Sequence, residues 1–106
     1  MILRVYRIPV EPAKVAEYEE FERGEGLRMV RSMDGCLGCG FGPVKEEKGT
    51  YVFFSLWRDQ DSLEAARATP TWKRVTGKVD QQGLSRGGDA AQHVDVKASW
   101  GFGASR

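Results

Sequence analysis

The apolar residues in the first third of the chain predict a strand followed by a helix. Residues 2–9 combine β-branched and aromatic side chains and end in proline, a pattern that predicts a first strand. From Ala13 to Met33, apolar residues recur at steps of three or four, which predicts one amphipathic helix whose middle is weakened by Gly24 and Gly26. The turn signal Asp34-Gly35 is expected to end that helix.

Two further strands are predicted in the middle of the chain. Residues 36–46 are rich in glycine and precede a short polar turn. Residues 50–57 (TYVFFSLW) give the strongest strand signal, with large side chains on both faces. Tyr51, Phe53 and Trp57 share one of these faces, but the sequence does not show which face is covered by helices.

The last third predicts a second helical region and a closing strand. Asp61 and Glu64 resemble a capping box that starts a helix, and Thr69-Pro70 is expected to interrupt it before it restarts with Trp72. Residues 83–92 are polar and read as a loop. Residues 93–100 then alternate cleanly between polar and apolar positions, as an edge strand does.

This order of elements, βαββαβ, predicts an α+β domain of the ferredoxin-like type with a four-stranded antiparallel sheet. We expect a single domain over residues 1–100 and a flexible tail over residues 101–106. Two helices cover one face of such a sheet, and the other face keeps large apolar groups. A second copy of the chain is the simplest cover, so we expect a homodimer joined sheet to sheet.

Charge and composition narrow the range of partners. The 106 residues carry a formal net charge of +1, which provides no overall field for nucleic acid or anionic lipid. The longest uncharged stretch, residues 35–44, is far shorter than the roughly 20 apolar residues of a membrane-spanning helix. We therefore expect no nucleic-acid partner, no membrane contact and a cytoplasmic location.

Cys36 and Cys39 form a C-x-x-C pair, the spacing found in some redox and zinc sites. A zinc site needs four ligands, and His93 is the only histidine in the chain. On a regular strand, positions three apart also point to opposite faces. We expect two small structural cysteines and no metal site.

Several short motifs, in their order and spacing, resemble the antibiotic biosynthesis monooxygenase family of dimeric α/β barrels. They are Glu19-Glu20-Phe21 in the first helix, the turn from Asp34 to Gly38, and the strand from Tyr51 to Trp57. The resemblance implies a homodimer, with a pocket between sheet and helices in each subunit. Several members oxygenate hydroxylated aromatic or quinol substrates with no flavin or metal, so we expect no cofactor.

Other members of that family degrade haem, and this sequence departs from their pattern. Their asparagine on the first strand corresponds to Tyr6 or Arg7 here, and the tryptophan of their second helix to Ala65 or Ala66. No histidine lies between Trp57 and Gln92 to bind iron. We do not expect haem degradation of that kind.

Oxygenation without a cofactor requires a substrate anion, and therefore apolar walls with a few donors or a base. As catalytic candidates we consider Trp57, whose indole N–H can donate to a substrate oxygen, Arg74, and His93, whose ordinary pKa suits proton transfer. The candidate substrate-binding residues are Tyr6, Tyr51, Phe53 and Trp72. Each also has a structural reading, as core for the aromatic residues and as surface for Arg74.

Three functions remain open from the sequence. The first is a small monooxygenase of hydroxylated aromatic or quinol-type molecules, and the second is a non-catalytic dimeric protein that binds a hydrophobic small molecule. The third is a purely structural partner of another protein, which predicts no well-formed cavity.

Overall fold

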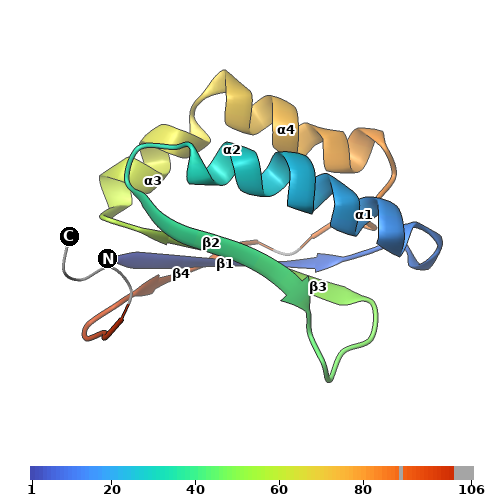
Figure 1. The fold of residues 1–106 in the computed structure, drawn as a ribbon, viewed down its shortest axis with the longest axis horizontal. Helices are drawn as coiled ribbons and strands as arrows, with labels where there is room; N and C mark the ends of the chain where they lie inside the picture. Colours follow the sequence, from blue (N-terminus) through green and yellow to red (C-terminus); the bar gives the residue numbers. More distant parts are fainter. Residues whose placement is uncertain (89, 102–106) are drawn as a thin grey trace.

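In the computed structural model, which describes residues 1–88 and 90–101, a four-stranded antiparallel sheet is covered by helices on one face (Figure 1). The strand order is β2-β3-β1-β4, so the first and third strands are central. The predicted ferredoxin-like fold is therefore confirmed. The elements are β1 (Ile2–Pro9), a 3₁₀ turn η1 (Pro12–Lys14), α1 (Val15–Phe21), a π-helical turn η2 (Glu22–Gly26), α2 (Leu27–Arg31), β2 (Cys36–Pro43), β3 (Thr50–Trp57), α3 (Gln60–Arg67), α4 (Pro70–Gln81) and β4 (Gln92–Asp95).

The first helical region changes its winding halfway along. α1 runs into η2 and then into α2, so the chain is helical throughout but wider at Glu22–Gly26. The weak middle predicted at Gly24 and Gly26 falls within this π-helical turn. π-helical turns are rare in proteins overall, and those that occur often lie at functional sites.

Strand β3 presents its most buried side chains to the helices. Tyr51, Phe53 and Trp57 are almost completely buried, whereas Phe54 is 45% exposed on the opposite face. Phe53 lies opposite Tyr6 in the register. The even-numbered residues of β1 therefore also face the helices. The face of β3 that carries Tyr51, Phe53 and Trp57 is thus the one that the helices cover.

The second helical region is divided where the sequence predicts. Thr69 caps α4, with its hydroxyl oxygen accepting a hydrogen bond from the amide of Trp72 at 3.1 Å, and Pro70 occupies the first turn. The predicted cap of α3 at Asp61 is wrong. Asp59 has the extended backbone that a cap needs, and its carboxylate accepts from the Ser62 amide at 2.8 Å, which leaves Asp61 inside the first turn.

The closing strand is shorter than the predicted residues 93–100. β4 spans only Gln92–Asp95, because its antiparallel partner β1 comes to its end there: Asp95 pairs with Ile2, and the Val96 amide donates to the Met1 carbonyl. Residues after this point are not part of the sheet, and Trp100 is 91% exposed. The expected flexible tail falls largely on residues 102–106, outside the described residues.

A β-bulge at the start of β2 changes the direction of the two cysteines. The register shifts between Cys36 and Gly38, so that Cys36 pairs with Trp57 and Cys39 pairs with Ser55. Both partners face the helices, and both cysteines therefore do so as well. The expectation that the cysteines point to opposite faces is wrong, because the extra residue of a bulge breaks strict alternation.

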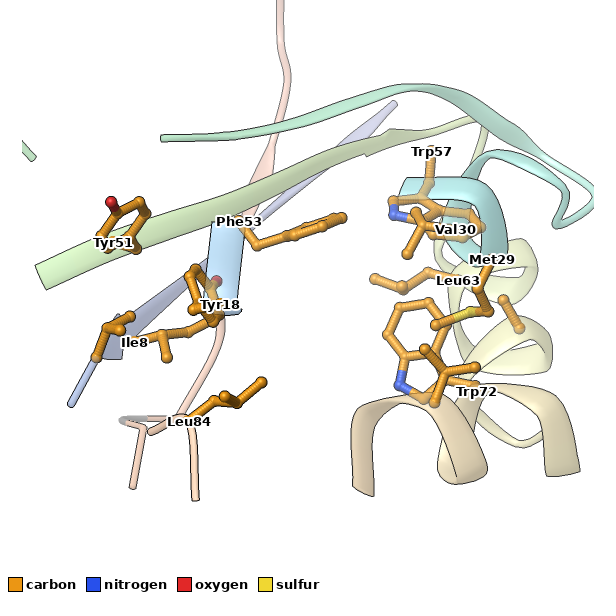
Figure 2. Packing of buried hydrophobic residues seen from close by; sticks show 13 residues of the cluster. Ile8, Tyr18, Met29, Val30, Tyr51, Phe53, Trp57, Leu63, Trp72 and Leu84 are labelled. Carbon is orange, nitrogen blue, oxygen red and sulfur yellow. The ribbon is translucent and has the colours of Figure 1, made fainter. Parts of the chain in front are cut away.

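The core lies between the sheet and the helices in two groups of side chains. Figure 2 shows Ile8, Tyr18 and Leu84 on one side and Trp57, Leu63 and Trp72 on the other. Phe53 projects from β3 between the groups. Across residues 1–88 and 90–101, no helix is both long and apolar enough to cross a membrane.

Candidate functional site

A cavity of about 620 Å³ lies between the inner face of the sheet and the helices η2, α2 and α4. Its size suits a small organic molecule, since ligand pockets usually measure about 300–1,000 Å³. The apolar part of its wall consists mainly of Ile8, Phe21, Met29, Val30, Phe53, Trp72, Val75 and Val79. Phe53, which projects between the two core groups (Figure 2), lines this cavity.

Glu22 brings a carboxyl group to this cavity from the π-helical turn. The residue is only 5% exposed, and its Oε2 accepts a hydrogen bond of 2.8 Å from the Tyr18 hydroxyl. Burial raises the pKa of Glu22 from 4.5 to about 7, and the hydrogen bond from Tyr18 partly opposes that rise. A carboxyl group with such a pKa can both accept and return a proton near neutrality.

The position of this carboxyl group depends on a glycine one turn along the helix. A Cβ at Gly26 would lie 1.9 Å from Oε1 of Glu22 and 3.6 Å from Cε2 of Phe53. The Glu22 side chain therefore folds over the bare backbone of Gly26, close to the ring of Phe53. No other residue type leaves room for that arrangement.

Tyr18 is itself held from the other side. Its ring contacts the ring of Tyr51 edge to face, with the centroids 5.1 Å apart, and the Tyr51 hydroxyl donates to the carboxylate of Glu19. Burial and the nearby Glu22 carboxyl raise the pKa of the Tyr18 hydroxyl, which therefore stays protonated and continues to donate.

Basic groups line the same cavity from the sheet and from α3 and α4. Arg4 and His93 are neighbours in the register of β1 and β4, and Arg67 and Lys73 contribute from the helices. Burial, followed by the charges of Arg4 and Arg67, lowers the pKa of His93 below its ordinary 6.5. The imidazole is therefore mostly neutral at neutral pH and can donate one hydrogen bond.

The structure brings four of the seven candidate residues together at the cavity: Tyr6, Phe53, Trp72 and His93. The other three are placed elsewhere. Trp57 is completely buried, its indole N–H donates to Ser55 Oγ at 2.8 Å, and its ring packs on that of Trp72 with centroids 6.2 Å apart. Tyr51 lies behind Tyr18, and Arg74 is exposed on α4.

The polar residues of the cavity that sequence reasoning missed include Glu22 and Arg4. Glu22 lies in a run of charged residues that looks like a solvated helix face. The available signal was spacing: Tyr18, Glu22 and Gly26 follow at steps of four, on the same side of a helix. Arg4 lies two residues before Tyr6 on β1, so the two side chains share a face of the strand. Knowing that this face is covered by the helices would have placed Arg4 at the cavity.

The two cysteines lie outside this cavity. They line a separate small hollow with Leu27 and Arg31. Burial raises the pKa of both thiols, that of Cys39 to about 11. Within the described part of the chain, no group of three or more histidine, cysteine, aspartate or glutamate residues could hold a metal ion.

Solved structures similar to this one share its fold over nearly the whole chain. A candidate antibiotic biosynthesis monooxygenase from Deinococcus radiodurans is 11% identical, with a TM-score of 0.80 over 95% of this chain and 97% of its own. Another candidate, from Caulobacter crescentus, is 24% identical, with a TM-score of 0.76 over 92% and 90% of the two chains. A variant of SnoaB, a cofactor-independent oxygenase from Streptomyces nogalater, is 18% identical, with a TM-score of 0.76 over 92% and 94%.

A search of curated proteins found no match. The sequence profile described as antibiotic biosynthesis monooxygenase matches residues 1–77, which include β1, both helices that flank η2, β2, β3, α3 and most of α4. The expected resemblance is therefore confirmed, and the chain belongs to the antibiotic biosynthesis monooxygenase family.

Proposed function

We propose that this chain is a cofactor-independent monooxygenase that acts on a hydroxylated aromatic or quinol-type small molecule. The observation that carries the proposal is the Glu22 carboxyl group, which is buried against an apolar cavity with a pKa of about 7. SnoaB, which shares the fold, is a cofactor-independent oxygenase, and this likeness supports the same class of chemistry.

Glu22 supplies the base that such a reaction requires. Its carboxylate accepts the proton of a substrate hydroxyl, and the resulting anion is electron-rich enough to reduce oxygen directly. The anion adds oxygen at carbon to form a hydroperoxide, which loses water to leave a carbonyl group. One substrate and one oxygen molecule then give one quinone and one water, and no external reductant is needed.

The remaining candidates have supporting roles in this proposal. Tyr6, Phe53 and Trp72 hold the aromatic rings, because their side chains line the cavity. The neutral imidazole of His93 donates a hydrogen bond to the oxygen on which negative charge develops. Trp57 supports Trp72 from behind, and Arg74 has no contact with the cavity.

We also propose that the functional unit is a homodimer. The face of the sheet away from the helices carries Phe54 and Val94, which are 45% and 47% exposed. Gly40 on the neighbouring strand provides a flat support for Phe54, since a Cβ there would lie 2.6 Å from the ring. A second copy that packs on this face would remove both apolar side chains from water.

Oxygen consumption tests the proposed activity. Wild-type protein is mixed with a panel of hydroquinones, naphthols and anthrones, with neither flavin nor metal added and with a chelator present. We expect consumption with at least one compound, a rate that rises with pH through about 7 as Glu22 ionises, and a loss on the order of 100-fold in Glu22→Gln.

Glu20→Gln is the matched control, because it removes an exposed carboxyl group from the adjacent helix α1. This variant should keep the wild-type rate. If a compound of the panel raises the melting temperature but consumes no oxygen, the chain is a binding protein, which is the second function open from the sequence. Turnover that is equal in wild type and Glu22→Gln would refute the role of Glu22 as the base.

A further inference from the structure

Positive charge is concentrated at one end of the cavity. Arg4 and His93 face it from adjacent strands, Arg67 comes from α3 and Lys73 from the first turns of α4. Among the described residues of the wall, Asp80 is the acidic residue besides Glu22, and it lies seven residues after Lys73 on α4. That separation is about 10 Å along the helix axis, so Asp80 does not neutralise the basic end.

Arg4 is the centre of this basic end. Its guanidinium carbon lies 5.3 Å from the centroid of the Tyr6 ring and 5.3 Å from that of the Trp72 ring. These two aromatic contacts place π faces beside the cation, but they provide no hydrogen-bond acceptor in the plane of its N–H groups. Nε of Arg4 is buried with no hydrogen-bond partner, and among residues 1–88 and 90–101 no carboxylate forms a salt bridge with Arg4.

A half-buried cation in this state is costly for the protein. Burial, followed by the like charge of Arg67, lowers the pKa of Arg4 to about 10, and Tyr6 opposes that fall only in part. A planar guanidinium offers a fork of parallel N–H donors that matches a carboxylate in two hydrogen bonds. An anionic group of a ligand would complete this site.

We propose that the basic end of the cavity, formed by Arg4, Arg67, Lys73 and His93, binds a carboxylate, and that the substrate is therefore a hydroxylated aromatic acid. This inference rests on the proposed function, because it names the substrate class of the same cavity. Arg4 receives the carboxylate, and Tyr6 and Trp72 receive the ring next to it.

The position of Glu22 agrees with such a substrate. Its carboxyl group lies close to Phe53, which pairs with Tyr6, and Tyr6 is two residues from Arg4 on β1. Two residues of a strand span about 7 Å, on the order of the length of a fused aromatic ring system. A molecule held at Arg4 by its carboxylate would present its other end toward the base.

Binding of a matched ligand pair tests this proposal. Hydroxynaphthoate and naphthol share the ring system and the hydroxyl group, and only the first carries a carboxylate. Their Kd values are measured by isothermal titration calorimetry under nitrogen, so that no turnover takes place. We expect wild-type protein to bind hydroxynaphthoate on the order of tenfold to a hundredfold more tightly, the range given by a charge-assisted hydrogen bond.

Arg4→Gln should remove most of that preference and leave the affinity for naphthol near the wild-type value, which also shows that the variant is folded. Arg67→Gln tests the same site from an exposed helix position, where loss of folding is not expected, and should reduce the preference by a smaller factor. The matched control is Arg7→Gln. Arg7 is on the same strand but faces away from the helices and pairs with Glu47, so this variant should keep the full preference.

Equal affinity of wild type for both ligands would overturn the proposal, as would absence of hydroxynaphthoate binding or a preference that survives in both Arg4→Gln and Arg67→Gln. These outcomes are distinct from failure of the proposed function. Turnover of neutral naphthols by a protein without carboxylate preference would leave the oxygenase proposal standing. Selective binding of the acid without oxygen consumption would leave only the binding site.

Discussion

Replacing Glu22 by glutamine should change how the stability of the protein depends on pH. Glutamine has nearly the same shape, can still accept the hydrogen bond from Tyr18, and does not ionise. The pKa of Glu22 is about 7 in the folded chain and 4.5 in an ordinary carboxyl group. The folded state therefore favours the protonated form, and ionisation of Glu22 opposes folding.

The sign and size of the effect follow from this difference. The stability linked to the bound proton is fully present below pH 4.5, decreases as the pH rises and is lost above about 7. Since each pH unit corresponds to about 1.4 kcal/mol, the wild type should lose on the order of 3 kcal/mol across this window. Glu22→Gln lacks this loss, so it should gain stability relative to the wild type as the pH rises.

Urea unfolding followed by circular dichroism at about pH 5 and about pH 8 measures the free energy of unfolding of both proteins. Every other titrating group is common to the pair, so the change in their difference between the two pH values isolates Glu22. Glu20→Gln, which alters an exposed carboxyl group, should show no such change. A difference between wild type and Glu22→Gln that is constant with pH, or that moves in favour of the wild type, would refute the buried-carboxyl reasoning.

Four further results are expected. Gly26→Ala, a change that usually stabilises a helix by about 1 kcal/mol, should instead lower the melting temperature, because the new Cβ would lie 1.9 Å from Glu22 Oε1; an unchanged or higher value would contradict the packing described. Thr69→Ala should cost about 1 kcal/mol in urea unfolding through loss of the α4 cap, and no loss would mean that the cap is redundant. Phe54→Lys should shift sedimentation toward the monomer at a fixed concentration, and an unchanged oligomeric state would place the interface elsewhere. The thiol of Cys39, with a pKa of about 11, should react with iodoacetamide at about pH 8 more slowly in the folded protein than in urea, and equal rates would show that it is not protected.

The fold was predictable because its signals are local and repeated. The strand at residues 50–57 combines β-branched and aromatic residues on both faces, and proline marks the start of the first helical region at Pro12 and the start of α4 at Pro70. Such signals depend on the chemistry of a few neighbouring residues. The length of β4 was not predictable in that way, because it depends on where a strand that is distant in sequence begins.

The candidate site was only partly predictable, since hydrophobic patterning selects apolar residues. It identified Tyr6, Phe53 and Trp72, which line the cavity. It passed over Glu22, because a carboxyl group surrounded by other charged residues is normally exposed. The patterning also selected Trp57, because it is a large apolar residue on a central strand. Such a residue can be fully buried in the core as readily as it can line a cavity, and Trp57 is fully buried.

The bulge in β2 reverses which positions of the strand face the helices. Even-numbered Cys36 before Leu37 and odd-numbered Cys39 after it both face them, so the two thiols are neighbours at a spacing of three because the strand contains one extra residue. No substitution at a neighbouring position would separate them. Removal of Leu37 would restore regular alternation with Cys36 still opposite Trp57 and Cys39 still opposite Ser55, so both thiols would continue to face the helices.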